Sequence, residues 1–336
     1  MKILLTGGLG FIGSHTAVEL IEGGHEPVIV DNLSNSKIEV LDKIEKITGK
    51  RPKFYEIDVC DKKALENVFE ENKDIFGVIH FAGYKAVGES VAKPLMYYEN
   101  NLISTFNLLE VMQEYGCKNI VFSSSATVYS PKNTMPLTEN SALEASNPYG
   151  RTKLFNEHIL RDFQHVNTDF NVVLLRYFNP IGAHESGLLG EDPNGIPNNL
   201  MPYICKVAVG ELDHLNVFGN DYKTKDGTGV RDYIHVVDLA RAHVLAIEKI
   251  IKEGNIGLKT YNLGTGTGYS VLEIVEAFNR VNGDLVKYEI TARRPGDIDE
   301  CFASPKLAEE ELGFRAEKTL EEMCKSSYEF QKHNKK

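Results

Sequence analysis

Tyr149 and Lys153 are the residues whose types and spacing first suggest chemistry in this sequence. They lie four positions apart in SNPYGRTK, where a helical pattern begins, so both side chains are expected on one face of a helix. A fixed ammonium stabilises a neighbouring phenolate and lowers the pKa of the phenol, which predicts a base that works near neutral pH. The same spacing is common on solvated helix faces, so the assignment depends on what the other elements place beside this pair.

A glycine-rich turn near the start of the chain is the first such element. An apolar strand pattern at 2–6 leads into GGLGFIG, with Gly7, Gly10 and Gly13, and a helical pattern follows. Strand, turn and helix in this order are typical of a dinucleotide fingerprint, in which the helix N-terminus receives a pyrophosphate. The next strand, PVIVD, ends in Asp31, whose carboxylate can bind both hydroxyls of an adenosine ribose and would repel a 2′-phosphate. This favours NAD over NADP.

Strand and helix patterns alternate through the first half of the chain. Further strands are expected at 53–58, 76–83, 119–125 and 171–182, and a long helix at 94–115. The alternation predicts an α/β fold with a Rossmann-type doubly wound parallel sheet, whose ligands bind beyond the carboxyl ends of the strands. Asp58, Gly83 and Ser125 lie at such ends, so Ser125, Tyr149 and the cofactor are expected to converge at one edge.

Composition and charge restrict the class of protein. The 336 residues are enough for a nucleotide-binding domain at 1–179 and a smaller C-terminal α/β substrate lobe at 180–336, with some exchange of segments between them. A net charge of −11 argues against nucleic acid as a partner. No apolar run approaches the ~20 residues that span a membrane, and the first residues do not resemble a signal peptide, so a cytoplasmic protein is expected. Five scattered cysteines predict neither a disulfide framework nor a metal site.

The second half of the chain offers residues for an anion site. Arg231 and the pair Arg293-Arg294 lie in glycine-containing loops, and arginine can clamp a phosphate with two parallel N–H bonds. Asp297 could accept hydrogen bonds from a ribose, and Phe218 could stack on a base. Taken alone, each of these residues fits a solvated charge or a core aromatic better.

Three motifs together resemble the extended short-chain dehydrogenase/reductase superfamily: GxxGxxG at 7–13, SSSATVY at 123–129, and Tyr149-x-x-x-Lys153. Longer segments over nearly the whole chain, GEDPNGIPNNLMPY and TGVRDYIHV among them, are similar to the UDP-glucose 4-epimerase family. The resemblance implies interconversion of UDP-galactose and UDP-glucose through a 4-keto sugar, with tightly bound NAD accepting and returning the C4 hydride. It also implies a homodimer, in which the helix at 94–115 and the helix that begins near Tyr149 form a four-helix bundle.

The resemblance assigns roles to individual residues. It implies that Tyr149 removes the proton of the 4-hydroxyl, that Lys153 lowers the pKa of Tyr149 and bonds the nicotinamide ribose, and that Ser125 bonds the 4-oxygen. The implied NAD contacts are Gly7, Gly10, Phe11, Ile12, Gly13, Asp31, Asn32, Asn35, Ser36, Asp58, Val59, Phe81, Ala82, Gly83, Lys85, Asn100, Ser123, Tyr149, Lys153, Tyr177 and Phe178. The implied UDP-sugar contacts are Lys85, Ser125, Tyr149, Asn179, Asn199, Leu200, Phe218, Arg231, Arg294, Asp297 and Cys301.

Two residues depart from the pattern of the family. Ser130 replaces the usual glycine after ATVY, so a local change of the backbone is expected there. Cys301 stands where some members carry a bulky tyrosine against the sugar, and members with a smaller residue resemble those that also accept N-acetylated sugars. Interconversion of UDP-GlcNAc and UDP-GalNAc is therefore expected as well. The alternative is a buried cysteine without influence on substrate range.

Two rival functions are less compatible with the sequence. Nucleotide-sugar 4,6-dehydratases need an added acid/base pair after the catalytic Ser or Thr, where this chain has Ala126 and Thr127. A protein that only senses NAD has no need for Tyr149, Lys153 and Ser125 together.

Overall fold

Strands and helices alternate along most of the chain in the computed structural model, which describes residues 1–193, 195, 197–294 and 296–335. The strands are β1 (Lys2–Thr6), β2 (Glu26–Asp31), β3 (Lys53–Glu56), β4 (Ile75–His80), β5 (Asn119–Ser125), β6 (Asn171–Tyr177), β7 (Asn179–Ile181), β8 (Leu215–Phe218), β9 (Val230–His235), β10 (Leu258–Leu263), β11 (Gly268–Ser270), β12 (Tyr288–Thr291) and β13 (Glu300–Cys301). The helices are α1 (Phe11–Glu22), α2 (Val40–Thr48), α3 (Lys62–Glu71), α4 (Val87–Ala92), α5 (Pro94–Glu114), the 3-10 turn η1 (Ala126–Val128), α6 (Pro148–Val166), α7 (Leu200–Ala208), α8 (Val236–Glu253), α9 (Val271–Asn282), α10 (Lys306–Leu312) and α11 (Leu320–Asn334).

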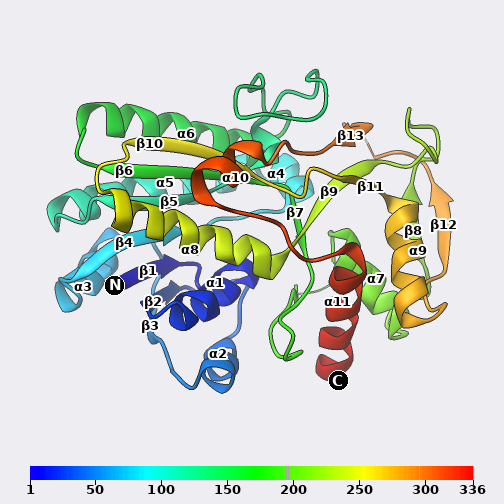
Figure 1. Cartoon of the computed structure of the whole chain (residues 1–336), viewed down its shortest axis with the longest axis horizontal. Coiled ribbons are helices and arrows are strands. Elements are labelled where there is room, and N and C mark those ends of the chain that lie inside the picture. The colour runs from blue at the N-terminus through cyan, green and yellow to red at the C-terminus, as the bar shows by residue number, and fades with distance from the viewer. Residues whose placement is uncertain (194, 196, 295, 336) are drawn as a thin grey trace.

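Seven of the described strands form one parallel sheet in the order β10-β6-β5-β4-β1-β2-β3 (Figure 1). The chain begins in the middle of the sheet and adds strands first on one side and then on the other, which is the doubly wound order of a Rossmann-type fold. The predicted fold class is confirmed. In such a sheet the carboxyl ends of the strands share one edge, so β1, β2, β4 and β5 all deliver their following loops to the same region.

The sheet is covered on both faces, because successive strand residues point to opposite sides. Ile3 and Leu5 of β1 pack with apolar residues of α1, α2 and α8, whereas Leu4 packs with those of α3, α5 and α6. All three side chains are fully buried. This two-sided burial explains why the strands are almost continuously apolar in sequence.

A second, smaller set of strands lies beyond the large sheet (Figure 1). Strand β9 pairs with β7, β11 and β13, and β8 pairs with β12. Helices α7, α9 and α11 pack around a separate apolar cluster with these strands. Helix α8 and strand β10 return to the large sheet, where β10 pairs with β6, so segments are exchanged between the two parts of the chain. We propose the domain boundary near residues 179 and 180, where β6 is followed at once by β7 of the smaller sheet.

Several predicted boundaries differ from the structure. The single strand expected at 171–182 is two strands, because the chain leaves the large sheet at Phe178 and joins β9 as β7. Strand β3 ends before Asp58, whose carboxylate instead accepts from the backbone N–H of Cys60 (2.8 Å) in a local turn. The family-like segment GEDPNGIPNNLMPY contains Asn194 and Ile196, and the glycine-containing loop of Arg293 and Arg294 contains Pro295. These three residues lie outside the described residues.

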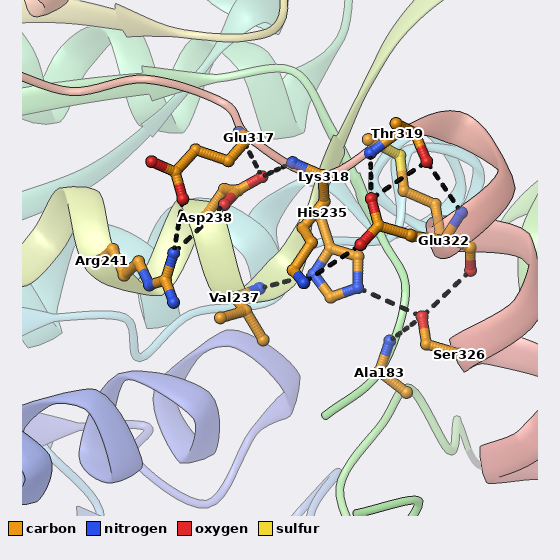
Figure 2. Close-up of polar contacts among 11 residues, drawn as sticks. Ala183, His235, Val237, Asp238, Arg241, Glu317, Lys318, Thr319, Glu322 and Ser326 are labelled. Carbon is orange, nitrogen blue, oxygen red and sulfur yellow. Dashed lines mark hydrogen bonds and ion pairs between the residues drawn. The ribbon is translucent and has the colours of Figure 1, made fainter. Parts of the chain in front are cut away.

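Polar contacts attach α11 to the corner between β9 and α8 (Figure 2). Asp238, in the first turn of α8, accepts from the backbone N–H groups of Glu317 (3.1 Å) and Lys318 (2.9 Å), just before α11 begins. His235 at the end of β9 pairs through Nε2 with Ser326 Oγ of α11 (3.2 Å).

Among the described residues, no helix combines the length and apolar character needed to cross a membrane.

Candidate active site

A cleft of about 2060 Å³ is lined by residues of both sheets. It exceeds the ~300–1,000 Å³ typical of a pocket for one small ligand, so it has room for more than one. All of the residues that the sequence analysis assigned to NAD, UDP-sugar or catalysis, from Gly7 to Cys301, line this cleft. Their convergence is a finding of the structure, while their individual contacts remain predictions.

Tyr149 and Ser125 are delivered to the cleft by two adjoining elements. Tyr149 lies in the first turn of α6, which starts with Pro148 and is capped by Asn147 Oδ1 accepting from Gly150 N (2.8 Å). Ser125 is the last residue of β5, and its hydroxyl accepts from the N–H (3.2 Å) and the hydroxyl (3.0 Å) of Thr127. The helix cap and the turn after β5 thus fix where the two reactive oxygens lie.

Lys153 lies near Tyr149, and its effect on the pKa of the Tyr149 phenol stays a prediction. Its Nζ donates to the carbonyl of Ser123 (2.7 Å) and lies 6.0 Å from the centre of the Tyr149 ring. Because the lysine is buried, desolvation lowers the pKa of Lys153 to about 8. Burial also raises the pKa of Tyr149, opposed by hydrogen bonding to Ser125 and by the positive charge of Lys85. Lys85 is thus a cation of the cleft that favours the phenolate.

Glu191 is a residue of the cleft that sequence reasoning missed. Its Oε1 accepts from Lys85 Nζ (3.0 Å) and from Asn199 Nδ2 (2.8 Å), and its side chain is almost buried. The carboxylate raises the pKa of Lys85 and so keeps that ammonium charged. A single acidic residue in a Gly- and Pro-rich loop gives no periodic signal, and only its two contacts reveal its place in the site.

The glycine turn fits a dinucleotide. A Cβ at Gly13 would lie only 2.5 Å from the Gly7 carbonyl oxygen, so glycine is needed for α1 to pack closely on the turn. Gly10 begins α1 without a side-chain cap, which leaves the N–H groups at this helix end available to a phosphate. Asp31 accepts from Leu9 N (3.0 Å) and Ser36 Oγ (2.7 Å). These bonds hold its carboxylate in the cleft, where a ribose with free hydroxyls would bind.

The residues of the predicted anion site lie together in the smaller lobe. Arg231 and Arg294 both pair with Asp297, and the Arg294 guanidinium lies 5.0 Å from the centre of the Phe218 ring. Asp297 is thus the partner of the two arginines, and its predicted hydrogen bonds to a ribose stay a prediction. Arg293 does not line the cleft, because it stacks on Tyr222 at 3.7 Å and pairs with an aspartate outside it.

Ser130 and Cys301, the two departures from the family pattern, both fit their surroundings in the structure. Ser130 has no positive φ, so glycine is not required there, and its hydroxyl donates to Glu144 (2.8 Å). Cys301 pairs in register with Arg231 and packs against the apolar cluster that contains Tyr129 and Leu137. Burial raises the pKa of Cys301 to about 11, so it presents a neutral thiol to the cleft.

The fold and the site together define a nucleotide-binding enzyme of the short-chain dehydrogenase/reductase type. The doubly wound sheet carries the glycine turn and Asp31 at one edge, and Ser125, Tyr149 and Lys153 lie at the same edge. The protein-family model described as GDP-mannose 4,6 dehydratase matches residues 4–327. Ala126 and Thr127 follow Ser125 in η1, so the acid/base pair expected of a dehydratase is not at these positions.

Relatives that match over almost their whole length indicate a more specific family than the family model does. UDP-glucose 4-epimerase of Bacillus subtilis (strain 168) is 61% identical over 334 residues, which is 99% of this chain and 98% of that protein. The enzyme of the same name from Mus musculus is 52% identical, covering 99% and 97%. The crystal structure of UDP-glucose 4-epimerase from Bifidobacterium longum in complex with NAD+ and UDP superposes with a TM-score of 0.96 at 54% identity, covering 99% of each chain. This chain belongs to the UDP-glucose 4-epimerase family, as its motifs predicted.

Proposed function

We propose that this protein interconverts UDP-galactose and UDP-glucose, with NAD as its bound cofactor. One observation carries the proposal: a single cleft is lined by the Tyr149 and Ser125 pair, by Asp31, and by Arg231 with Arg294. Two relatives named UDP-glucose 4-epimerase, which match this chain almost end to end, support it. No acid/base pair follows Ser125 at 126–127, which disfavours elimination of water as the alternative outcome.

The reaction needs a base at the sugar hydroxyl. Tyr149 as phenolate accepts the proton of the 4-hydroxyl, and Ser125, which bonds the same phenol, can bond the sugar oxygen or relay the proton. Lys85 stabilises the phenolate by its charge, and Glu191 holds Lys85 in place. When NAD is bound, it supplies the reversible two-electron oxidation of the sugar carbon.

The two ends of the substrate are held differently in this proposal. Arg231 and Arg294 bind the diphosphate and Phe218 stacks on the uracil, so most of the binding free energy comes from groups remote from the sugar. The sugar faces Cys301 and neighbouring apolar side chains, which make no directional bonds. It can therefore turn over in the cleft while UDP remains bound, and the hydrogen returns to the opposite face of the same carbon.

Turnover without added cofactor is the direct test. The purified protein is incubated with UDP-galactose and no NAD, and the product sugar is identified. We expect UDP-glucose, and we expect Tyr149→Phe to lower kcat by about 10²–10⁴-fold, the range for a general base. A Tyr149→Phe variant with full activity would contradict the mechanism, and an inactive wild-type protein would contradict the function.

We propose that the range of sugars is wider. Cys301 lines the cleft from β13, and a cysteine side chain is much smaller than the tyrosine that some family members carry at this position. A solved structure 36% identical to this chain, with a TM-score of 0.85, is described as the UDP-Glc/GlcNAc 4-epimerase from Campylobacter jejuni. We include UDP-GlcNAc and UDP-GalNAc in the proposed substrates.

The proposal extends to a cytoplasmic homodimer. Helices α5 and α6 pack side by side, with Tyr98 stacked on Phe155 at 6.0 Å. Their outer surface exposes Leu95 (79% exposed), Phe106 (45%) and Phe155 (42%), a set that a second copy of the chain would cover in a four-helix bundle. The five cysteines are free, as is usual in a reducing compartment.

A further inference from the structure

The three consecutive serines at the end of β5 have different surroundings. Ser125 lines the cleft beside Tyr149, and the carbonyl of Ser123 accepts from Lys153 Nζ (2.7 Å). Ser124 has neither role, because it is fully buried and does not line the cleft. Its hydroxyl donates to Glu157 Oε1 (2.5 Å), a carboxylate on α6.

Glu157 lies one helical turn after Lys153, and its side chain is buried. Arg176 of β6 donates to both of its oxygens, from Nε to Oε1 (2.8 Å) and from the terminal nitrogen to Oε2 (2.5 Å). Ser124 and Arg176 are direct neighbours in the pairing of β5 with β6. One carboxylate therefore joins α6 to both strands, in a place where each polar group is satisfied.

Two successive turns of α6 are thus bonded to two successive residues of β5, through Lys153 to Ser123 and through Glu157 to Ser124. Tyr149 lies on the preceding turn of α6, and Ser125 is the following residue of β5. A shift of the helix along the strand would separate the two hydroxyls that act on the sugar. We propose that Ser124 and Glu157 are positioning residues, which fix α6 on β5 and thereby hold Tyr149 against Ser125.

Ser124→Ala tests this inference, which rests on the proposed function. The substitution leaves Glu157 bonded to Arg176, so no buried charge loses its partner. We expect kcat for UDP-galactose to fall about tenfold, since small misplacements of reacting groups are costly, while KM stays unchanged because UDP is held elsewhere. The acid limb of the kcat profile should move to higher pH, because the Ser125 bond that favours the Tyr149 phenolate is weakened. Unchanged kcat and an unchanged acid limb would overturn the inference.

Two further variants separate positioning from stability. Glu157→Gln keeps an oxygen that can accept from Ser124 but removes the counter-charge of Arg176. Glu157→Gln should lower Tm more than Ser124→Ala does and leave the acid limb where it is in the wild type. A shift of the acid limb equal to that of Ser124→Ala would contradict the inference.

Ser327→Ala removes a buried hydroxyl of α11, bonded to Gly182 N (3.1 Å), and should change Tm only. A wild-type protein without UDP-galactose turnover contradicts the proposed function, whereas an active wild type with an unaltered Ser124→Ala contradicts this inference alone.

Discussion

Tyr149 can act as a base only where its phenol loses a proton, and burial opposes that loss. Lys85 supplies the opposing charge, so Lys85→Met should raise the pKa of Tyr149. We expect the acid limb of kcat/KM to move to higher pH, with activity reduced near pH 7 and largely recovered in alkali. Rates measured from pH 6 to 10 check this. Lys93→Met, which removes an exposed lysine paired with Glu89, is the control and should leave the profile unchanged.

Cys301 is the residue that we propose decides the range of sugars. Its half-buried thiol lies beside Arg231 and borders the cleft, so Cys301→Tyr would place a ring where the proposed function requires space for an N-acetyl group. We expect UDP-GalNAc turnover to fall by about 10²-fold, since a ring and an acetamide cannot share the space, while UDP-galactose turnover changes little. The two rates are measured side by side. A wild-type protein that turns over UDP-galactose briskly and UDP-GalNAc not at all would contradict the expectation.

Helix α11 packs with α7 and α9, and polar contacts join the segment before it to α8 (Figure 2). Asp238 is buried and accepts from two backbone N–H groups of the segment before α11, so Asp238→Ala leaves both without this partner. We expect the free energy of unfolding to fall by about 1–3 kcal/mol and amide exchange in α11 to become faster. Kinetic constants should be retained, because Asp238 does not line the cleft.

Glu317→Ala is the matched control for this contact, because it removes an exposed carboxylate that pairs with Arg241 at 3.2 Å. An exposed ion pair is worth about 0–1 kcal/mol, so the control should be nearly neutral. Equal losses of stability in the two variants would show that the buried acceptor is not what anchors the helix.

The elements could be predicted from the sequence wherever one periodicity dominated. Strand β5 and helix α5 occur where they were expected, since an apolar run and a long amphipathic pattern each have only one good solution. Helices α2 and α4 and strands β9, β11, β12 and β13 were not anticipated. Each is short, and pairing with a distant segment, such as β13 with β9, decides the conformation of these strands.

At the scale of the whole molecule, the sequence placed the site residues by their strand ends and by family resemblance, and the structure brings them to one cleft. What could not be predicted is which polar groups face each other there. Glu191 reaches Lys85 from a distant loop, and Asp297 neutralises two arginines. Such pairings depend on the relative position of segments remote in sequence, and they add Lys85 as a source of charge at Tyr149.

The proposed association of two copies would bury the outer surface of α5 and α6. Phe106 is exposed near the middle of α5, and in a two-fold interface each copy would bury its own ring. We expect the wild-type protein to sediment as a dimer and Phe106→Glu to sediment as a monomer, because the change would bury two unpaired carboxylates in one interface. Tyr288→Glu, on strand β12 and equally exposed (45%), is the control and should remain dimeric. A wild-type protein that is monomeric at micromolar concentration, or a Phe106→Glu variant that stays dimeric, would place the interface elsewhere or remove it.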